Sequence, residues 1–362
     1  MARRRWRLPI GANPIVVKEL RSRMRGGRAF LLLTGFLVGL GMVGYGLFLR
    51  ATSGERFGQP LFSAQIGQTL FAGLAFTLLF LVCLVAPAVT VGAISSERER
   101  LTYEMLVSTS LPPWRLLWGK LISSLSYVAL LLIAAVPLGS IVYLFGGITV
   151  RNVLEAATII VLTAITSALI GIWASALTGR TGRAAVLAYL IIALVLGGLL
   201  FSAEIWTTRS DQPVPRALLT PNPISALASS VAVLSGPSGQ MFSGPMPMGD
   251  VAVKGGGMFF DPSQYNTGLA FPGWRTFSIG IYPPADPNAF GPNGMPLQPE
   301  PRSTWRTTLV IEAMACLALF WMSLHAVRPR RRWRITWGDL AMLSLTAFSL
   351  LGLGFWRGWW LR

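Results

Sequence analysis

The chain has 362 residues, of which 53% are hydrophobic and only 12% are charged, and its formal net charge is +17. Because a soluble domain carries about 25% charged residues, this composition excludes an ordinary soluble protein and indicates a chain surrounded by lipid. The positive charge does not indicate a nucleic-acid partner. The basic residues lie beside long apolar runs, where anionic lipid headgroups and membrane topology account for them.

The N-terminal region is basic and leads into an apolar run. Within 13–28, Val16, Leu20 and Met24 recur every fourth residue, while Lys18 and Arg21 lie on the remaining surface. This pattern predicts a basic amphipathic helix in the membrane interface, with a solvated helix as the alternative. The run that follows lacks a small-residue cleavage site, so it is predicted to be a retained span and not a signal peptide.

Apolar runs of about 20 residues are long enough to cross a bilayer as helices. Six such runs follow one another, at about 29–49, 69–94, 121–145, 156–177, 184–206 and 307–327. A last run, 338–356, fits either a seventh span or a helix lying in the interface. The predicted fold is therefore an all-α polytopic membrane protein with six spans, or seven if 338–356 also crosses.

The segments between the spans differ in charge. Basic residues gather in 1–28, 95–120, 178–183 and 328–334, whereas 50–68 and 146–155 carry only Arg50, Arg56 and Arg151. The positive-inside rule then predicts a cytoplasmic N-terminus in a plasma (inner) membrane.

The same pattern predicts a division of the chain into four regions. They are a cytoplasmic tail with the interfacial helix (1–28), spans 1–5 with a cytoplasmic loop at 95–120 (29–206), a proline-rich outer loop (207–306), and a C-terminal region with span 6 (307–362). Within the outer loop, 217–235 is apolar enough to dip into the interface.

Motifs for nucleotide, metal or catalytic chemistry are missing. The sequence holds no G-x-x-x-x-G-K-[ST] and no H-E-x-x-H, and its single histidine, His325, adjoins a basic run. No cofactor, metal or enzymatic activity is therefore expected. Charge within the spans is scarce, and Glu312 is the candidate for an ion or proton pathway, with a carboxylate at headgroup level as the alternative. This scarcity favours a transport protein whose energy arrives from outside the chain.

A patterned charged segment, 95–120, lies between two of the spans. Glu97 and Arg100 are spaced i, i+3, which predicts a helix with an internal ion pair. Leu101 and Met105 give this helix one apolar edge, and Pro112 ends it. Such a segment is well placed to receive a push from a soluble partner, and an ordinary solvated loop is the alternative.

This segment resembles the type-2 ABC transporter permease family through the pattern S-x-E-R-E-x-x-T-x-E-x-L-x-x-T-x-L, followed by G-K. The residues that carry the pattern are Ser96, Glu97, Arg98, Glu99, Thr102, Glu104, Leu106, Thr109, Leu111, Gly119 and Lys120. The N-terminal helix resembles the family's entry helix through Asn13, Pro14, Lys18, Glu19 and Arg21. The sequence departs from the family at Leu101-Thr102, where Gly-Thr is frequent.

The resemblance implies the transmembrane subunit of an ABC exporter, without a nucleotide site of its own. Such a subunit pairs with an ATP-binding subunit and with a second copy or a paralogous permease. It implies coupling to the ATPase through a cytoplasmic helix at 95–110, by Glu97, Arg98, Glu99, Thr102 and Glu104, and docking by the interfacial helix. Two alternatives remain: an ATP-independent secondary carrier or membrane scaffold, and a membrane-embedded enzyme, for which the sequence offers no polar constellation.

Overall fold

The computed structural model describes residues 27–52, 62–103, 113–209, 216–232 and 304–327, together with four isolated positions between 344 and 349. Within that part of the chain there is no strand, and six helices are long and apolar enough to cross a membrane. They are Phe30–Leu49, Ile66–Glu99, Trp114–Leu144, Val150–Leu177, Thr181–Ala203 and Trp305–Val327. The predicted all-α polytopic fold is confirmed.

Three predicted features lie outside the described residues. They are the interfacial helix with Lys18, Glu19 and Arg21, most of the outer loop (233–303), and the run 338–356 apart from the isolated positions.

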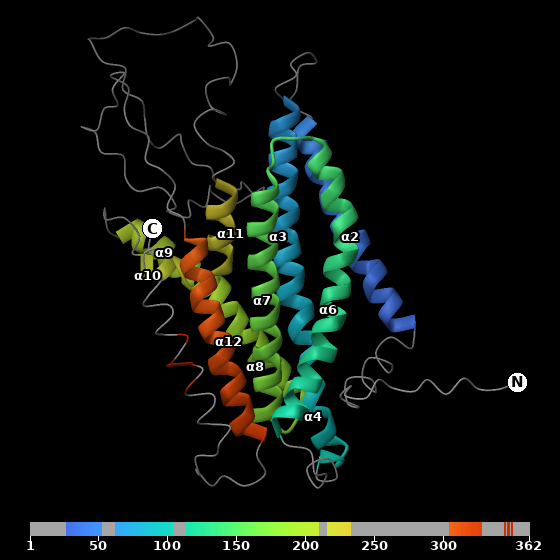
Figure 1. Ribbon diagram of the computed structural model, residues 1–362, viewed down its shortest axis with the longest axis vertical. Helices are drawn as coiled ribbons and strands as arrows, with labels where there is room; N and C mark the ends of the chain where they lie inside the picture. Colours follow the sequence, from blue (N-terminus) through green and yellow to red (C-terminus); the bar gives the residue numbers. More distant parts are fainter. Residues whose placement is uncertain are drawn as a thin grey trace, which may run out of the picture.

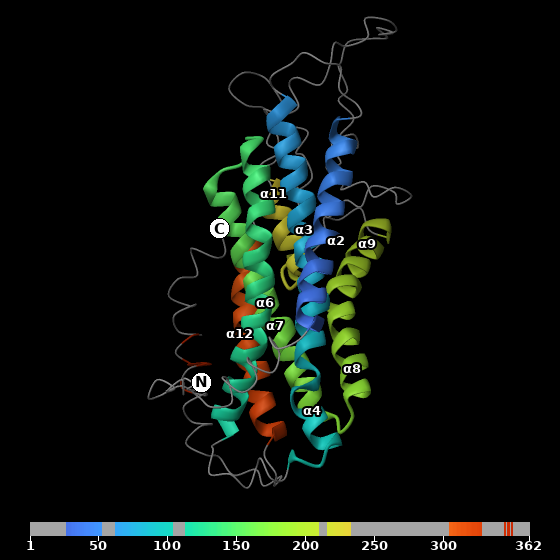
Figure 2. The ribbon, with the colours of Figure 1, turned by 90° about the vertical axis from the view of Figure 1, so that its right-hand side faces the viewer.

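The helices form an elongated bundle (Figure 1). In chain order they are α2 (Gly27–Thr52), α3 (Phe62–Thr90), α4 (Gly92–Glu99), α6 (Pro113–Leu144), α7 (Val150–Leu177), α8 (Thr181–Ala193), the π-helix η1 (Leu194–Gly198), α9 (Leu199–Arg209), α10 (Arg216–Leu219), α11 (Pro223–Ala232) and α12 (Trp305–Val327). We call the end of the bundle that holds α4 the α4 end. The beginnings of α6 and α8 and the last residues of α7 and α12 also lie there (Figures 1 and 2).

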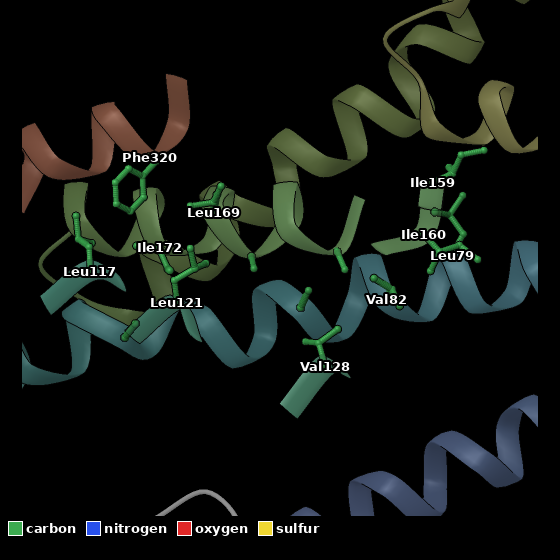
Figure 3. Packing of buried hydrophobic residues seen from close by; sticks show 14 of the residues in the cluster. Leu79, Val82, Leu117, Leu121, Val128, Ile159, Ile160, Leu169, Ile172 and Phe320 are labelled. Atoms are coloured by element: carbon green, nitrogen blue, oxygen red, sulfur yellow. The ribbon is translucent and has the colours of Figure 1, made fainter. Parts of the chain in front are cut away.

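Helix α7 is the centre of the bundle and packs against α3, α12, α8, α11, α6 and α4. Its start is set locally, because Thr149 accepts a hydrogen bond from the Asn152 backbone N–H in a capping box. Apolar side chains of α7 interdigitate with those of three neighbouring helices (Figure 3). The residues labelled there are Leu79, Val82, Leu117, Leu121, Val128, Ile159, Ile160, Leu169, Ile172 and Phe320.

The contact between α3 and α7 depends on a glycine, Gly171 of α7, which has no side chain. A Cβ added to Gly171 of α7 would lie 2.0 Å from Thr90 Oγ1 and 3.2 Å from Pro87 Cα. The Thr90 hydroxyl is itself held in place, because it lies 3.0 Å from the Ala86 carbonyl oxygen and is fully buried. Small residues at membrane helix contacts let the backbones approach in this way.

Gly171→Ala is therefore expected to lower the free energy of unfolding by about 1–3 kcal/mol, the usual cost of overpacking. Denaturant titration of the purified protein in mixed micelles measures this. The matched control is Gly139→Ala in α6, where an added Cβ meets nothing within 4 Å. Adding Thr90→Ala to Gly171→Ala should restore part of the loss, and equal stability of both alanine variants would contradict the argument.

Residues 217–235, predicted to dip into the interface, instead place a helix inside the bundle. Helix α11 packs against α7, α12 and α3, and its Ala226, Leu227 and Ser229 are fully buried. Just before α11, Asn222 donates from Nδ2 to the Leu196 carbonyl oxygen at 2.9 Å. This bond ties α11 to η1, a π-helical segment within the fifth span. This span, predicted at about 184–206, extends over Thr181–Ala203.

Candidate functional site

The candidate site is the α4 segment, defined as residues 92–103, which lies where several spans end. Helix α3 ends at Thr90, and α4 restarts at Gly92 after Val91. Residues that the sequence selected as coupling residues lie on this segment. Glu97, Arg98 and Glu99 each bond to a different set of helices.

The first turn of α4 is capped by α7. The backbone N–H groups of Ile94 and Ser95 both donate to Ser175 Oγ, each at 2.9 Å. Ser175 is fully buried. Helix N-termini leave amide groups without partners in their own helix, and here a hydroxyl from the end of α7 accepts two of these bonds.

Arg98 joins the ends of α7 and α12. Its Nη1 donates to the Ala176 carbonyl oxygen at 2.7 Å, and its Nη2 donates to the Ala326 carbonyl oxygen at 3.4 Å. These carbonyls belong to the last turns, where the helix dipole is negative and favours a cation. Tyr103 completes the contact. Its ring lies 4.8 Å below the Arg98 guanidinium carbon, and its hydroxyl donates to the Val327 carbonyl.

Glu97 pairs with α6, and the predicted Glu97–Arg100 ion pair is wrong. Lys120 Nζ lies 2.8 Å from Glu97 Oε1 and also donates to the Ala93 carbonyl. The Lys120 side chain is 3% exposed and that of Glu97 is 26% exposed. Arg100 is exposed, so the pairing follows the lower dielectric of the bundle and not the helical spacing.

Glu99 holds the start of α8. Thr181, the first residue of α8, donates from its backbone N–H to Glu99 Oε1 at 2.7 Å and from its hydroxyl to Glu99 Oε2 at 3.0 Å. A carboxylate is favoured at a helix N-terminus, because the unpaired N–H groups and the dipole are positive there.

The predicted single helix over 95–110 is wrong in its middle, because α4 ends at Glu99. Leu101 has φ +57°, the left-handed conformation. Its N–H donates to the Arg98 carbonyl, and the N–H of Thr102 donates to the Glu97 carbonyl. This is a Schellman ending, in which glycine is the usual left-handed residue. Leu101 stands where the resembling family often has glycine, and its side chain is 83% exposed.

The structure thus gives Glu97 and Arg98 contacts inside the bundle, while Glu99 is exposed to solvent and is bonded to the start of α8. Thr102 is exposed and closes the turn on Glu97, while Glu104 lies outside the described residues. Sequence reasoning did not assign roles to Ser175, Thr181 or Tyr103, and it named Lys120 only as part of the family pattern. The sequence did contain a signal for the role of Lys120, because it is a lone lysine at the start of an apolar run.

Glu312 lies apart from this segment, on α12. It is 5% exposed, and Thr163 Oγ1 of α7 lies 3.0 Å from its Oε1 and 3.3 Å from its Oε2. Thr163 stands at the middle of the 28-residue helix α7. Glu312 therefore faces the interior of the bundle at mid-helix depth.

Comparison with known protein families identifies the family of the chain. The model of the family described as "ABC-2 family transporter protein" matches residues 55–356, which is most of the chain and includes the α4 segment. No curated protein matches the chain. With its apolar helices, the chain therefore belongs to the ABC-2 transporter family and is a multi-pass membrane permease of an ATP-binding cassette transporter.

Proposed function

We propose that this permease uses ATP hydrolysis in a separate ATP-binding subunit, and that the α4 segment transmits the motion of that subunit to the spans. The observation that carries the proposal is that one short segment holds the ends of α6, α7, α8 and α12. On this proposal the α4 end and the N-terminus lie on the cytoplasmic side of the plasma membrane. The permease itself is not an enzyme.

The contacts of the α4 segment suit transmission better than docking. Glu97 and Arg98 are partly buried and bonded to the spans, and Glu99 is bonded to the start of α8 although its side chain is exposed. A displacement of α4 must either move the helix ends that these residues hold or break charge-assisted hydrogen bonds, which are roughly twice as strong as neutral ones. The role of these three residues is therefore to connect α4 with the substrate pathway.

Leu101 is the residue of the α4 segment that suits docking. It presents an apolar side chain to the solvent at the tip of the turn, 83% exposed. A left-handed backbone costs an L-residue about 1–2 kcal/mol, so local stability alone favours glycine at this position. The ATPase contact offsets this cost by burying the leucine side chain. The interfacial helix with Lys18, Glu19 and Arg21 docks beside it, against the ATPase and membrane lipids.

Gentle purification from native membranes, followed by identification of the co-purifying ATPase, supplies the partner for the test. Leu101→Gly should weaken ATPase binding tenfold or more, because burying a leucine side chain contributes about 1.5–3 kcal/mol. The same variant should raise the permease's own free energy of unfolding by about 1 kcal/mol, as the strain is removed. Binding is measured by titrating labelled ATPase onto permease in nanodiscs.

The matched control is Leu144→Ala, to be compared with Leu101→Ala. Leu144 is 84% exposed, at the other end of the bundle, and should leave ATPase binding unchanged. If both Leu101 variants bind the ATPase and stimulate its ATP hydrolysis as the wild type does, Leu101 is not part of the contact. Purification without any ATPase or ATP hydrolysis would instead favour an ATP-independent carrier or scaffold.

The second permease subunit, as a copy or a paralogue, completes the proposed transporter. Exposed apolar side chains run along α2 and α8, including Met42, Tyr45, Val186 and Leu190. Lipid covers such faces as readily as a second subunit does, so the choice between homodimer and heterodimer is left to the composition of the purified complex.

A further inference from the structure

Glu312 takes no part in the contacts of the α4 segment, yet it is placed at an unfavourable position for a carboxylate. It is 5% exposed and faces Thr163 at the middle of α7. An ionised carboxylate is costly at the centre of a membrane span unless a cation or several hydrogen-bond donors surround it. The hydrogen-bond partners and the charges around Glu312 therefore decide what the group does.

No cation among the described residues pairs with Glu312. Lys120 is paired with Glu97, and Arg151 is paired with Glu155. Helices α3 and α11 carry no charged residue. Of the other charged groups on α6 and α12, Arg115 lies near the start of α6, Arg306 lies over the Trp305 ring, and His325 lies near the end of α12. The remaining titratable groups are the phenols of Tyr127 and Tyr143 on α6 and the thiol of Cys316 on α12, and the Cys83 thiol of α3 lies 4.0 Å from Ser167.

A count of hydrogens at Thr163 indicates which group donates. Thr163 Oγ1 lies 2.8 Å from the Ile159 carbonyl oxygen and 3.0 Å from Glu312 Oε1. A hydroxyl has one proton and two acceptor lone pairs. If Glu312 is ionised, two acceptors share this one proton at the centre of the bundle. If Glu312 is a neutral acid, its own O–H donates to Thr163 and the Thr163 proton goes to Ile159, so both contacts are satisfied.

The next turn of the same helix pair repeats the geometry with a neutral donor. Thr166 Oγ1 lies 2.9 Å from the Leu162 carbonyl oxygen and 3.2 Å from Cys316 Sγ. With the Thr166 proton on Leu162, the Cys316 thiol is the donor to Thr166. Glu312 and Cys316 are four residues apart on α12, so both face α7 on one stripe. In both places the arrangement suits a protonated group on α12 and a threonine on α7.

We propose that Glu312 is a proton-binding site that joins α7 and α12. With its proton bound, the neutral carboxyl donates to Thr163 Oγ1 and the two helices pack closely. Without it, the carboxylate needs water or a cation, and the contact must open to admit one. The ligand is a proton and not a cationic part of the cargo, because a proton can reach a group that is 5% exposed without the bundle first opening. The inference rests on this geometry and does not depend on the proposed coupling to an ATPase.

Infrared spectroscopy of the purified permease in nanodiscs, without any ATPase, tests the proposal. At neutral pH the wild type should show a carbonyl-stretch band of a neutral carboxylic acid that is lost in Glu312→Gln. Thr163→Val should shift this band to higher frequency, because the hydrogen bond is removed. The matched control Glu155→Gln, on the same helix pair but ion-paired with Arg151, should keep it. Identical wild-type and Glu312→Gln spectra in this region would overturn the proposal, and so would loss of the band in Glu155→Gln alone.

A second measurement uses the wild type and so does not depend on a variant that folds. Dicyclohexylcarbodiimide enters apolar regions and adds to protonated carboxyl groups, whereas a water-soluble carbodiimide does not enter them. Mass spectrometry of the digested protein should find the adduct of the first reagent on Glu312, with no adduct of the second there. An adduct of the water-soluble reagent on Glu312 would show a carboxyl group that is open to water and would overturn the proposal, while the ATPase experiments would be unaffected.

Discussion

Glu97→Gln is expected to lower the free energy of unfolding of the permease by about 3 kcal/mol, because it removes the carboxylate that balances the charge of the buried Lys120. The Lys120 side chain is 3% exposed, so it cannot reach water when the carboxylate is lost. Lys120→Met should cost less, since the Glu97 side chain is 26% exposed and remains partly hydrated. Denaturant titration in mixed micelles measures both variants.

The double variant Glu97→Gln/Lys120→Met separates the ion pair from other effects. Its stability should be close to that of Lys120→Met alone, because no unpaired buried charge is left, and the cycle then gives the coupling between the two residues. Arg151→Ala is the matched control. It breaks an ion pair of the same 2.8 Å length whose arginine is 74% exposed, and should cost less than about 1 kcal/mol. Strictly additive losses for Glu97 and Lys120 would show that the pair contributes nothing.

Arg98→Ala is expected to loosen the ends of α7 and α12 and to lower permease-stimulated ATP hydrolysis at least tenfold. A hydrogen bond to a charged group contributes about 1.5–3 kcal/mol, and Arg98 makes its short one to the Ala176 carbonyl at 2.7 Å. A loss of about 2 kcal/mol raises local opening about 30-fold. Hydrogen exchange of the last-turn amides of α7 and α12 measures the opening, and hydrolysis assays with the reconstituted ATPase measure the coupling.

Arg98→Lys is the informative companion, because it keeps the charge but loses the planar fork that reaches two carbonyls. It should retain part of the helix-end protection and only part of the coupling. Arg100→Ala, which removes an exposed arginine two residues away, should leave hydrogen exchange of the permease unchanged. If Arg98→Ala keeps both the wild-type exchange rates and full ATPase stimulation, Arg98 has no role in transmission.

The six spans could be predicted from the sequence, but the contacts of the candidate site could not. An apolar run has few alternatives to a membrane helix, since every backbone polar group must be satisfied within the segment. The partners of Glu97, Arg98 and Glu99, by contrast, come from distant parts of the chain. Arg98 and Ala326 are 228 residues apart. The i, i+3 spacing of Glu97 and Arg100 favoured a local ion pair that the structure does not contain.

By itself, the sequence determined the class of protein, the position of the six spans and the charged segment that stands between two of them. Hydrophobicity, length and charge act locally along the chain, so these features are readable without a fold. The tertiary structure alone decided that Gly171 lies against Thr90, that α11 packs against α7, α12 and α3, that Glu97 and Arg98 face the bundle, and that Glu312 lies opposite the middle of α7. Each of these four features depends on which helices lie next to each other, and the packing of segments that are distant in the sequence decides this.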